Sequence, residues 1–504
     1  MQARLHQLEA TKAINNHIEG IIHLPTGTGK SFIQQIAITE NLANNVFVIL
    51  SPRILLTNQL YATIKNQLLN NNKDCHYLIV HSGKAEDKSD FKWSENMPYR
   101  EVQATTSQSV IIEEYQKAQR ENVPLIIFGT YDSAERIVNA EIPVYMLLCD
   151  EAHYLVSEEF HWIRYENHND NRKQFNAKRK YYFTATTKET IADTGLGMNN
   201  SDEYGPIIYS KTPLEMVVAG EILRPRLHLV DVSNYNAENE LDSDVNSIIE
   251  SFTEHRIHCK VGAKLLIVTK GSKHLNDIVS HPKILEELDT RPNLTIFDIS
   301  SEHKPRINGI IVKRNEFLNR LQSLTDADEA IILHVNILTE GIDVPGITGV
   351  MIMNNLKLAK FLQTLGRATR LHSKDREKLY NHLLTYNEVN RFVKPYAWII
   401  IPVYGVIGND LRDTITNIVY SLRSYGFNAA EDCVIKQSKG KAMPVSLDQL
   451  NELDTRGILY RDTIMNIVHD VEEKEVADRL VLEDYRNKEL LKSMTIDELI
   501  NTLK

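Results

Sequence analysis

Short apolar runs alternate with longer segments of mixed polarity along the first part of the chain. Each run has the length of one strand, and most of the segments between them carry apolar residues at helical spacing. The runs are residues 20–24, 45–50, 123–128, 143–149 and 180–183. Strands that alternate with helices predict a parallel sheet that is covered by helices on both faces.

The same alternation returns further along the chain. The apolar runs here are residues 264–270, 293–301, 329–335 and 349–353. After residue 406 the pattern becomes helical, at residues 411–422, 462–471 and 476–491. We therefore expect two α/β units, residues 1–212 and 213–405, followed by a helical C-terminal extension, residues 406–504.

Composition narrows the class of protein. Of the 504 residues, 42% are hydrophobic and 25% are charged, which is typical of a globular protein with sizeable cores. The net charge of −10 excludes a histone-like polycation but permits a local basic groove. Four scattered cysteines without a CxxC pair favour a reducing compartment.

No segment predicts export or insertion into a membrane. The longest apolar run, residues 397–404, is shorter than the ~20 residues that cross a bilayer. The first residues lack the pattern of a signal peptide. We expect a protein of the cytoplasm, the nucleus or a viral factory, neither secreted nor bound to a membrane.

A glycine-rich loop follows the first predicted strand and precedes a helix. The loop residues are Pro25, Thr26, Gly27, Thr28, Gly29, Lys30 and Ser31. This strand–loop–helix order lets backbone N–H groups and the helix N-terminus converge on phosphate oxygens. Lys30 is expected to contact the β- and γ-phosphates, and the Ser31 hydroxyl to bind Mg²⁺. One departure is Leu24, where the strict pattern has glycine.

The predicted strand at residues 143–149 ends in two carboxylates, Asp150 and Glu151. Open α/β sheets place their chemistry at the C-terminal ends of strands. Two adjacent acids suit two tasks, since one can hold Mg²⁺ while the other polarises a water. An acid after a strand can also simply cap a helix.

Three further positions are candidates for binding groups. The Gln7 side chain precedes the glycine-rich loop, and its carboxamide can both donate and accept hydrogen bonds to an adenine edge. Arg53 follows a proline at a strand end, where it can contact a phosphodiester or form a plain turn. Thr130 also follows a strand, and it can contact a phosphate or cap the next helix.

Two arginines stand near the end of the second unit. Arg367 and Arg370 are three residues apart, so they share a helix face. Guanidiniums held in this way could reach across a cleft to a γ-phosphate. The alternative is an ordinary surface helix with salt bridges.

In this order, the phosphate loop, the Asp-Glu-Ala-His strand and the Thr-Ala-Thr strand at residues 184–186 resemble superfamily 2 helicases and translocases. The resemblance implies tandem RecA-like lobes that bind ATP and Mg²⁺ between them. It implies that Asp150 and Ser31 hold the metal and that Glu151 activates water. It also implies that three residues couple the nucleotide state to nucleic acid: His153, Thr184 and Thr186.

The second unit extends the resemblance. The Gln…Gly-Arg…Arg pattern implies a catalytic role for Gln363 beside the two arginines. The stretch at residues 340–345 resembles the family's motif V, which implies that Gly341 and Asp343 lie near the ribose and that Thr339 lies near the nucleic acid backbone. Residues 204–209, 214–223 and 396–403 resemble the motors of type I, III and ISP restriction enzymes, while viral helicases share the same core.

These residues predict an ATP-driven helicase or translocase with DNA favoured over RNA as its partner. Two alternatives remain: an RNA helicase, and an ATP-gated clamp that belongs to a larger complex. No nuclease or methyltransferase pattern is found, so a complete restriction enzyme is not expected. The C-terminal helices are candidates for binding a protein partner.

Overall fold

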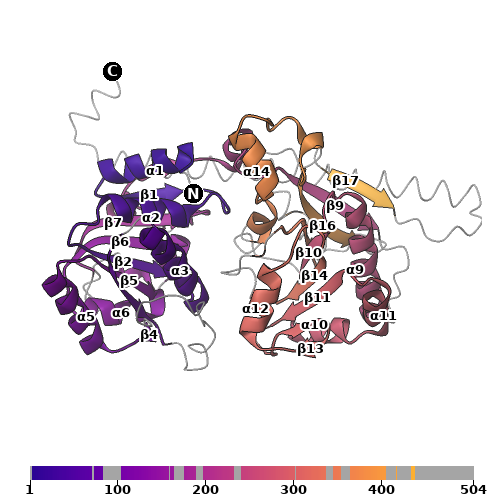
Figure 1. The fold of residues 1–504 in the computed structure, drawn as a ribbon, viewed down its shortest axis with the longest axis horizontal. Helices are drawn as coiled ribbons and strands as arrows, with labels where there is room; N and C mark the ends of the chain where they lie inside the picture. Colours follow the sequence, from indigo (N-terminus) through magenta and orange to yellow (C-terminus); the bar gives the residue numbers. More distant parts are fainter. Residues whose placement is uncertain are drawn as a thin grey trace, which may run out of the picture.

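The computed structural model confirms the predicted class, with two mostly parallel sheets and helices packed around them (Figure 1). It describes residues 3–70, 73–82, 104–157, 159–163, 175–188, 197–231, 240–300, 302–335, 344, 346–353, 364–403, 416 and 433–437. No helix within these ranges combines the length and the apolar character that crossing a membrane requires.

The first sheet has eight parallel strands in the order β4-β3-β5-β2-β6-β7-β1-β8. Its strands are β1 (Glu19–His23), β2 (Val46–Ser51), β3 (His76–Val80), β4 (Ala104–Thr105), β5 (Leu125–Thr130), β6 (Val144–Asp150), β7 (Ala177–Thr184) and β8 (Ile207–Ser210). The central strands β2, β5 and β6 are buried along nearly their whole length, as expected for strands covered on both faces.

Helices cover both faces of this sheet. They are α1 (Leu5–Asn16), α2 (Lys30–Glu40), α3 (Ile54–Asn70), α5 (Gln108–Glu121), α6 (Ala134–Asn139) and α7 (Ser201–Tyr204). Alternate side chains of β2 enter two different cores: Phe47 packs with α1, α2 and α3, and Val48 packs with α5 and α6. We call this sheet with its helices the first lobe.

The second sheet has nine strands in the order β13-β12-β11-β14-β10-β15-β16-β9-β17. They are β9 (Pro225–Asp231), β10 (Lys264–Val268), β11 (Leu294–Ile299), β12 (Arg306–Ile307), β13 (Ile310–Ile311), β14 (Glu329–His334), β15 (Gly349–Ile352), β16 (Ala397–Val403) and β17 (Cys433–Gln437). Only the short strands β12 and β13, which form a hairpin on the edge, are antiparallel to their neighbours.

The second lobe is this sheet with its helices. Its helices are α8 (Pro213–Val218), α9 (Glu240–Ile257), α10 (Ser272–Val279), α11 (Pro282–Thr290), α12 (Arg314–Gln322) and α14 (Ser373–Tyr380). Strand β10 again divides its side chains between two cores, with Leu266 on one face of the sheet and Leu265 on the other. The predicted unit limits at residues 212 and 405 remain predictions.

The C-terminal part differs from its sequence prediction at one point. The helices predicted at residues 411–422, 462–471 and 476–491 lie outside the described residues, apart from Thr416. Residues Cys433–Gln437 form strand β17, which pairs in parallel with β9. This part of the predicted helical extension therefore belongs to the second sheet.

Candidate functional site

A cavity of about 720 Å³ lies between the two lobes. It brings together most of the residues predicted for nucleotide chemistry, although they come from opposite sides of the molecule. The predicted residues that line it are Gln7, Thr26, Gly27, Gly29, Lys30, Ser31, Asp150, Glu151, Arg367 and Arg370. The other two residues of the phosphate loop, Pro25 and Thr28, are buried behind this wall.

The backbone of the phosphate loop adopts, at its two glycines, a conformation that favours glycine. Gly27 and Gly29 have φ angles of 87° and 86°, in the left-handed region that side chains disfavour. Helix α2 begins at Lys30, which lines the cavity, so the N-terminal end of the helix with its N–H groups lies at the cavity. The Lys30 ammonium donates to the carbonyl of Leu24 (3.3 Å), at the position where the strict pattern has glycine. Because Lys30 bonds to the backbone oxygen of residue 24, this contact does not depend on which side chain that residue carries.

The two acids lie at the end of β6. Asp150 is only 5% exposed, and its Oδ1 accepts a hydrogen bond from Gln34 Nε2 (3.0 Å). Burial, together with the charge of Glu151, raises the pKa of Asp150 to about 7, although Lys30 and the hydrogen bond from Gln34 act in the opposite direction. A carboxylate in this state gains stability from a nearby cation.

Glu151 is held in a strained conformation at the wall of the cavity. Its φ of 50° is left-handed, which is uncommon for a residue with a side chain. Its Oε2 is buried and accepts no hydrogen bond from the described part of the chain. Strain and an unsatisfied buried oxygen together are typical of a functional position.

The donors present fit Mg²⁺. The Ser31 hydroxyl and the Asp150 carboxylate line the same cavity, and both offer the oxygen ligands that Mg²⁺ prefers. The two adjacent acids, one buried and one with an unsatisfied oxygen, supply negative charge that a divalent cation would offset.

The three predicted coupling residues meet beside Glu151. His153 Nδ1 lies 3.2 Å from Thr184 Oγ1 and 3.5 Å from Glu151 Oε2. Thr184 Oγ1 donates to the carbonyl of Thr186 (2.7 Å) and accepts from its N–H (3.1 Å). A movement of Glu151 can therefore pass through His153 to the loop after β7.

Both arginines reach the cavity from the second lobe. They belong to residues 364–370, which we call the arginine segment and which begin as a helical turn. A Cβ on Gly27 would lie 3.3 Å from the carbonyl of Gly366 and 3.4 Å from Cγ of Arg370. The phosphate loop and the arginine segment are therefore in direct contact across the cavity.

Residues 219–224, which lie between α8 and β9 and which we call the joining segment, also contact the arginine segment. The N–H of Leu223 donates to the carbonyl of Thr369 (2.7 Å), and Ile222 forms an antiparallel bridge with Arg370. The neighbouring Glu221 forms an ion pair with Arg4, whose Nη2 donates to the carbonyl of Thr28 (2.6 Å). The joining segment thus connects the phosphate loop with the arginines.

Gln7 lines the cavity, but its carboxamide is engaged within the protein. Its Nε2 donates to the carbonyl of Thr28 (3.1 Å), and its Oε1 accepts from the N–H of Arg4 (3.0 Å). These bonds fix helix α1 against the phosphate loop. Its reading of an adenine edge remains a prediction.

Of the predicted nucleic-acid residues, Arg53 and Thr130 are not among the residues that line this cavity, although Pro52, next to Arg53, is. Arg53 and Thr130 follow or end the adjacent strands β2 and β5, in which Ser51 pairs with Thr130. Arg53 is exposed, whereas Thr130 is buried and its hydroxyl donates to Ser133 (3.0 Å). The remaining predicted residues fall outside the described ranges: Thr339, Gly341, Asp343 and Gln363.

Gln34 and Arg4, which bond to Asp150 and to the phosphate loop, are among the site residues that were not identified from the sequence. Gln34 stands four positions after Lys30 on the same face of α2, so helical spacing from the phosphate loop could have identified it. Arg4 precedes α1, and its contact with Thr28 depends on how that helix packs, which no local pattern reveals.

Comparison with known proteins finds a likeness to restriction enzymes. Residues 1–189 match the family model ResIII, described as the res subunit of type III restriction enzymes. No curated protein sequence matches the chain. The resemblance to restriction-enzyme motors expected from the sequence is confirmed by the family model and by the fold described next.

Two solved structures are similar to the whole fold. The DNA-bound type ISP restriction-modification enzyme LlaBIII is 16% identical, with a TM-score of 0.65, over 99% of this chain and 36% of its own. A nuclease-deletion mutant of the type ISP enzyme LlaGI, in complex with a DNA substrate mimic, is 17% identical, with a TM-score of 0.58, over 92% and 31%. The chain thus spans about a third of either enzyme, and at these identities the likeness concerns the fold.

Proposed function

We propose that this protein is an ATP-driven motor that acts on DNA, with ATP bound in the cavity between the lobes. The convergence of Lys30, the Asp150–Glu151 pair and the Arg367–Arg370 pair on one cavity carries this proposal. These are the positive and negative groups that phosphoryl transfer requires, and they come from two different lobes.

Each group has a task in the proposed hydrolysis. Lys30 and the backbone N–H groups of the loop hold the phosphates, and Glu151 orients a water for in-line attack and takes its proton. Arg367 and Arg370 offset the charge that develops on the γ-phosphate. A bound Mg²⁺, held by Ser31 and Asp150, would neutralise phosphate oxygens.

Hydrolysis is coupled to movement because the arginines belong to the other lobe. They complete the site only while the lobes are in contact, so the loss of the γ-phosphate releases that contact. A strand held by groups such as Arg53, Thr130 and Thr339 would then advance by one cycle of opening and closing. DNA is favoured because the similar structure of LlaBIII is bound to DNA and that of LlaGI is in complex with a DNA substrate mimic.

Steady-state ATP hydrolysis tests the proposal directly. It is measured at fixed salt without nucleic acid, and with single-stranded DNA, duplex DNA or RNA. We expect DNA to stimulate turnover, and we expect Lys30→Ala and Glu151→Gln to lower it at least about a hundredfold. The matched controls are Lys12→Ala on the exposed face of α1 and Glu159→Gln, which is exposed and outside the cavity lining.

The outcomes separate the candidate functions. Stimulation by RNA alone would favour an RNA helicase, and slow hydrolysis without movement would favour an ATP-gated clamp. Strand displacement and triplex displacement, measured side by side, distinguish unwinding from translocation. Full ATPase activity in Lys30→Ala or Glu151→Gln would refute the proposed site.

A further inference from the structure

A buried lysine forms hydrogen bonds to the backbone of the arginine segment. Lys394 is 3% exposed and lies between the short helix Val389–Arg391 and strand β16. Its ammonium donates to the carbonyl of Ala368 (2.6 Å) and to the carbonyl of Arg370 (3.0 Å). The helical turn that carries Arg367 ends at Ala368, so the carbonyl of Ala368 has the partial negative charge of a helix C-terminus, and Arg370 follows in its bridge with Ile222.

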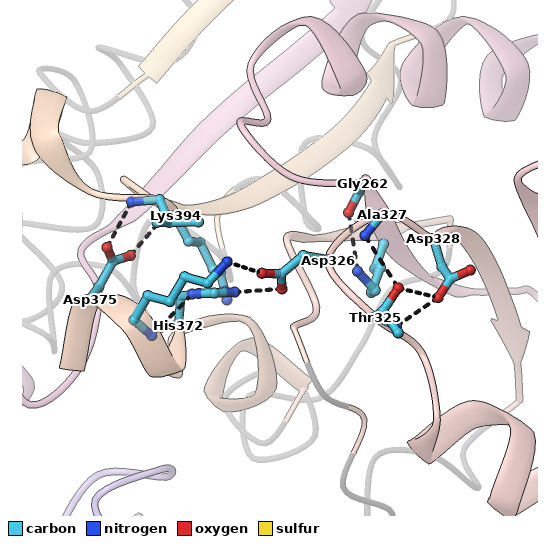
Figure 2. A network of polar contacts seen from close by, with 11 residues as sticks. Gly262, Thr325, Asp326, Ala327, Asp328, His372, Asp375 and Lys394 are labelled. Atoms are coloured by element: carbon cyan, nitrogen blue, oxygen red, sulfur yellow. Dashed lines mark hydrogen bonds and ion pairs between the residues drawn. The ribbon is translucent and has the colours of Figure 1, made fainter. Parts of the chain in front are cut away.

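The backbone of Lys394 is itself anchored. Asp375 in α14 is fully buried, and its two carboxylate oxygens accept from the N–H of Val393 (2.7 Å) and of Lys394 (2.9 Å). Figure 2 shows this carboxylate facing the lysine. Lys394 is therefore fixed at both ends, through its backbone to α14 and through its ammonium to the arginine segment.

The start of α14 is fixed by a second set of contacts. His372 and Lys374 both bind the carboxylate of Asp326, at 2.8 and 2.7 Å (Figure 2). The carbonyl of Asp326 accepts from the N–H of Gly262 (2.7 Å), which precedes β10. The chain that follows the arginine segment is thus bonded to the second sheet through Asp326. Lys394 connects this anchored part of the chain to the arginine segment.

We propose that Lys394 is a positioning residue for ATP hydrolysis, which holds the carbonyls of Ala368 and Arg370 so that both guanidiniums face the nucleotide cavity. The inference rests on the proposed function, because that function is what gives the two arginines a catalytic task. Without a fixed backbone, long arginine side chains lose the orientation on which charge stabilisation depends. A buried ammonium is costly to maintain unless it is well bonded, and here both observed acceptors belong to the arginine segment.

The ionisation of this lysine supplies a second readout. Burial lowers the pKa of Lys394 to about 7. The titratable and charged groups that face it are Cys259, Arg370, Asp375, Lys264 and His255. As the pH rises above about 7 the ammonium loses its charge and its hold on the carbonyls weakens. Arginine at this position would stay charged.

The experiment compares Lys394→Met with Lys260→Met. Lys260 is a matched control, because its ammonium also donates to two backbone carbonyls of this region, those of Asn390 and Phe392, but to none of the arginine segment. Turnover with saturating DNA, the KM for ATP, binding of a non-hydrolysable ATP analogue and the unfolding midpoint are measured for each.

We expect Lys394→Met to lower turnover about ten- to a hundredfold while analogue binding changes less than about threefold. In a protein that already carries Arg367→Ala and Arg370→Ala, Lys394→Met should cause no further loss, because its effect passes through those arginines. Lys394→Arg should restore part of the turnover and should reduce its decline above pH 7.

Three results would overturn the inference while the proposed function stands. Turnover in Lys394→Met equal to that in Lys260→Met would do so, as would an undiminished loss in the double-arginine variant. If Lys394→Met does not fold, Asp375→Asn replaces it, and full turnover in that variant counts against the inference. Wild-type protein without ATPase activity under any condition would instead refute the proposed function, and the inference with it.

Discussion

Gly366 in the second lobe lies directly against Thr26 of the phosphate loop. A Cβ added to Gly366 would stand 2.3 Å from the Cβ of Thr26, which is far inside van der Waals contact. The absence of a side chain at residue 366 is therefore what allows the arginine segment to approach the phosphates this closely.

Gly366→Ala should push the two lobes apart at this contact. We expect turnover to fall about a hundredfold, because a displacement of about 1 Å at a catalytic group has that effect. Binding of ATP to the first lobe should change little. Gly271→Ala is the control, since a Cβ there meets no atom within 4 Å. Unchanged turnover in Gly366→Ala would show that the lobes work in a more open arrangement.

Gln34→Met should weaken the binding of Mg²⁺. The substitution removes the hydrogen bond that Gln34 donates to Asp150, and this bond lowers the pKa of Asp150. A hydrogen bond to a charged group contributes roughly 1.5–3 kcal/mol, so the Mg²⁺ concentration for half-maximal ATPase should rise about tenfold. Gln35→Met, on the same helix but bonded to Thr39, should leave it unchanged.

Thr184→Val should uncouple hydrolysis from nucleic acid. Valine keeps the shape of threonine but removes the hydroxyl that contacts His153 and Thr186. We expect basal ATPase within about threefold of wild type and the loss of most of the stimulation by DNA. Thr184→Ser retains the hydroxyl and should retain stimulation. If DNA stimulates the valine variant as strongly as wild type, these contacts do not couple hydrolysis to nucleic acid.

The second lobe should lose stability in acid because of His255. Burial, together with the charges of His228, His258 and Lys394, lowers the pKa of His255 to about 3. The unfolded chain takes up this proton below about pH 6.5 and the folded chain does not, so the free energy of unfolding falls as the pH drops through this window. The decline is at most about 1.4 kcal/mol per pH unit.

Urea unfolding at pH 7.5 and pH 5.5 measures this effect. His255→Gln retains a partner for Thr348, to which His255 Nε2 is bonded at 2.7 Å, but removes the ionisation. The variant should therefore lose about 1 kcal/mol less stability than wild type over this interval. Equal losses would mean that another group dominates the acid response.

The sequence predicted those parts of the site that local patterns define. Lys30, Asp150 and Arg367 each stand in a short motif, and each takes its place from the strand or helix beside it. Gln34 and Lys394 act through contacts with residues 116 and 26 positions away, and such contacts depend on how elements pack. Strand β17 was missed because the chain after residue 406 was interpreted as helical, and its place beside β9 is set by the sheet rather than by a local pattern.

Strand β17 also imposes an order on synthesis. Strand β9 is the first strand of its sheet to leave the ribosome, yet its two neighbours, β16 and β17, are among the last. At roughly 5–20 residues per second, β9 waits on the order of ten seconds or more for both partners. During that time its backbone is open to pairing with other chains, so translation speed over residues 232–437 should influence how much protein reaches the native state.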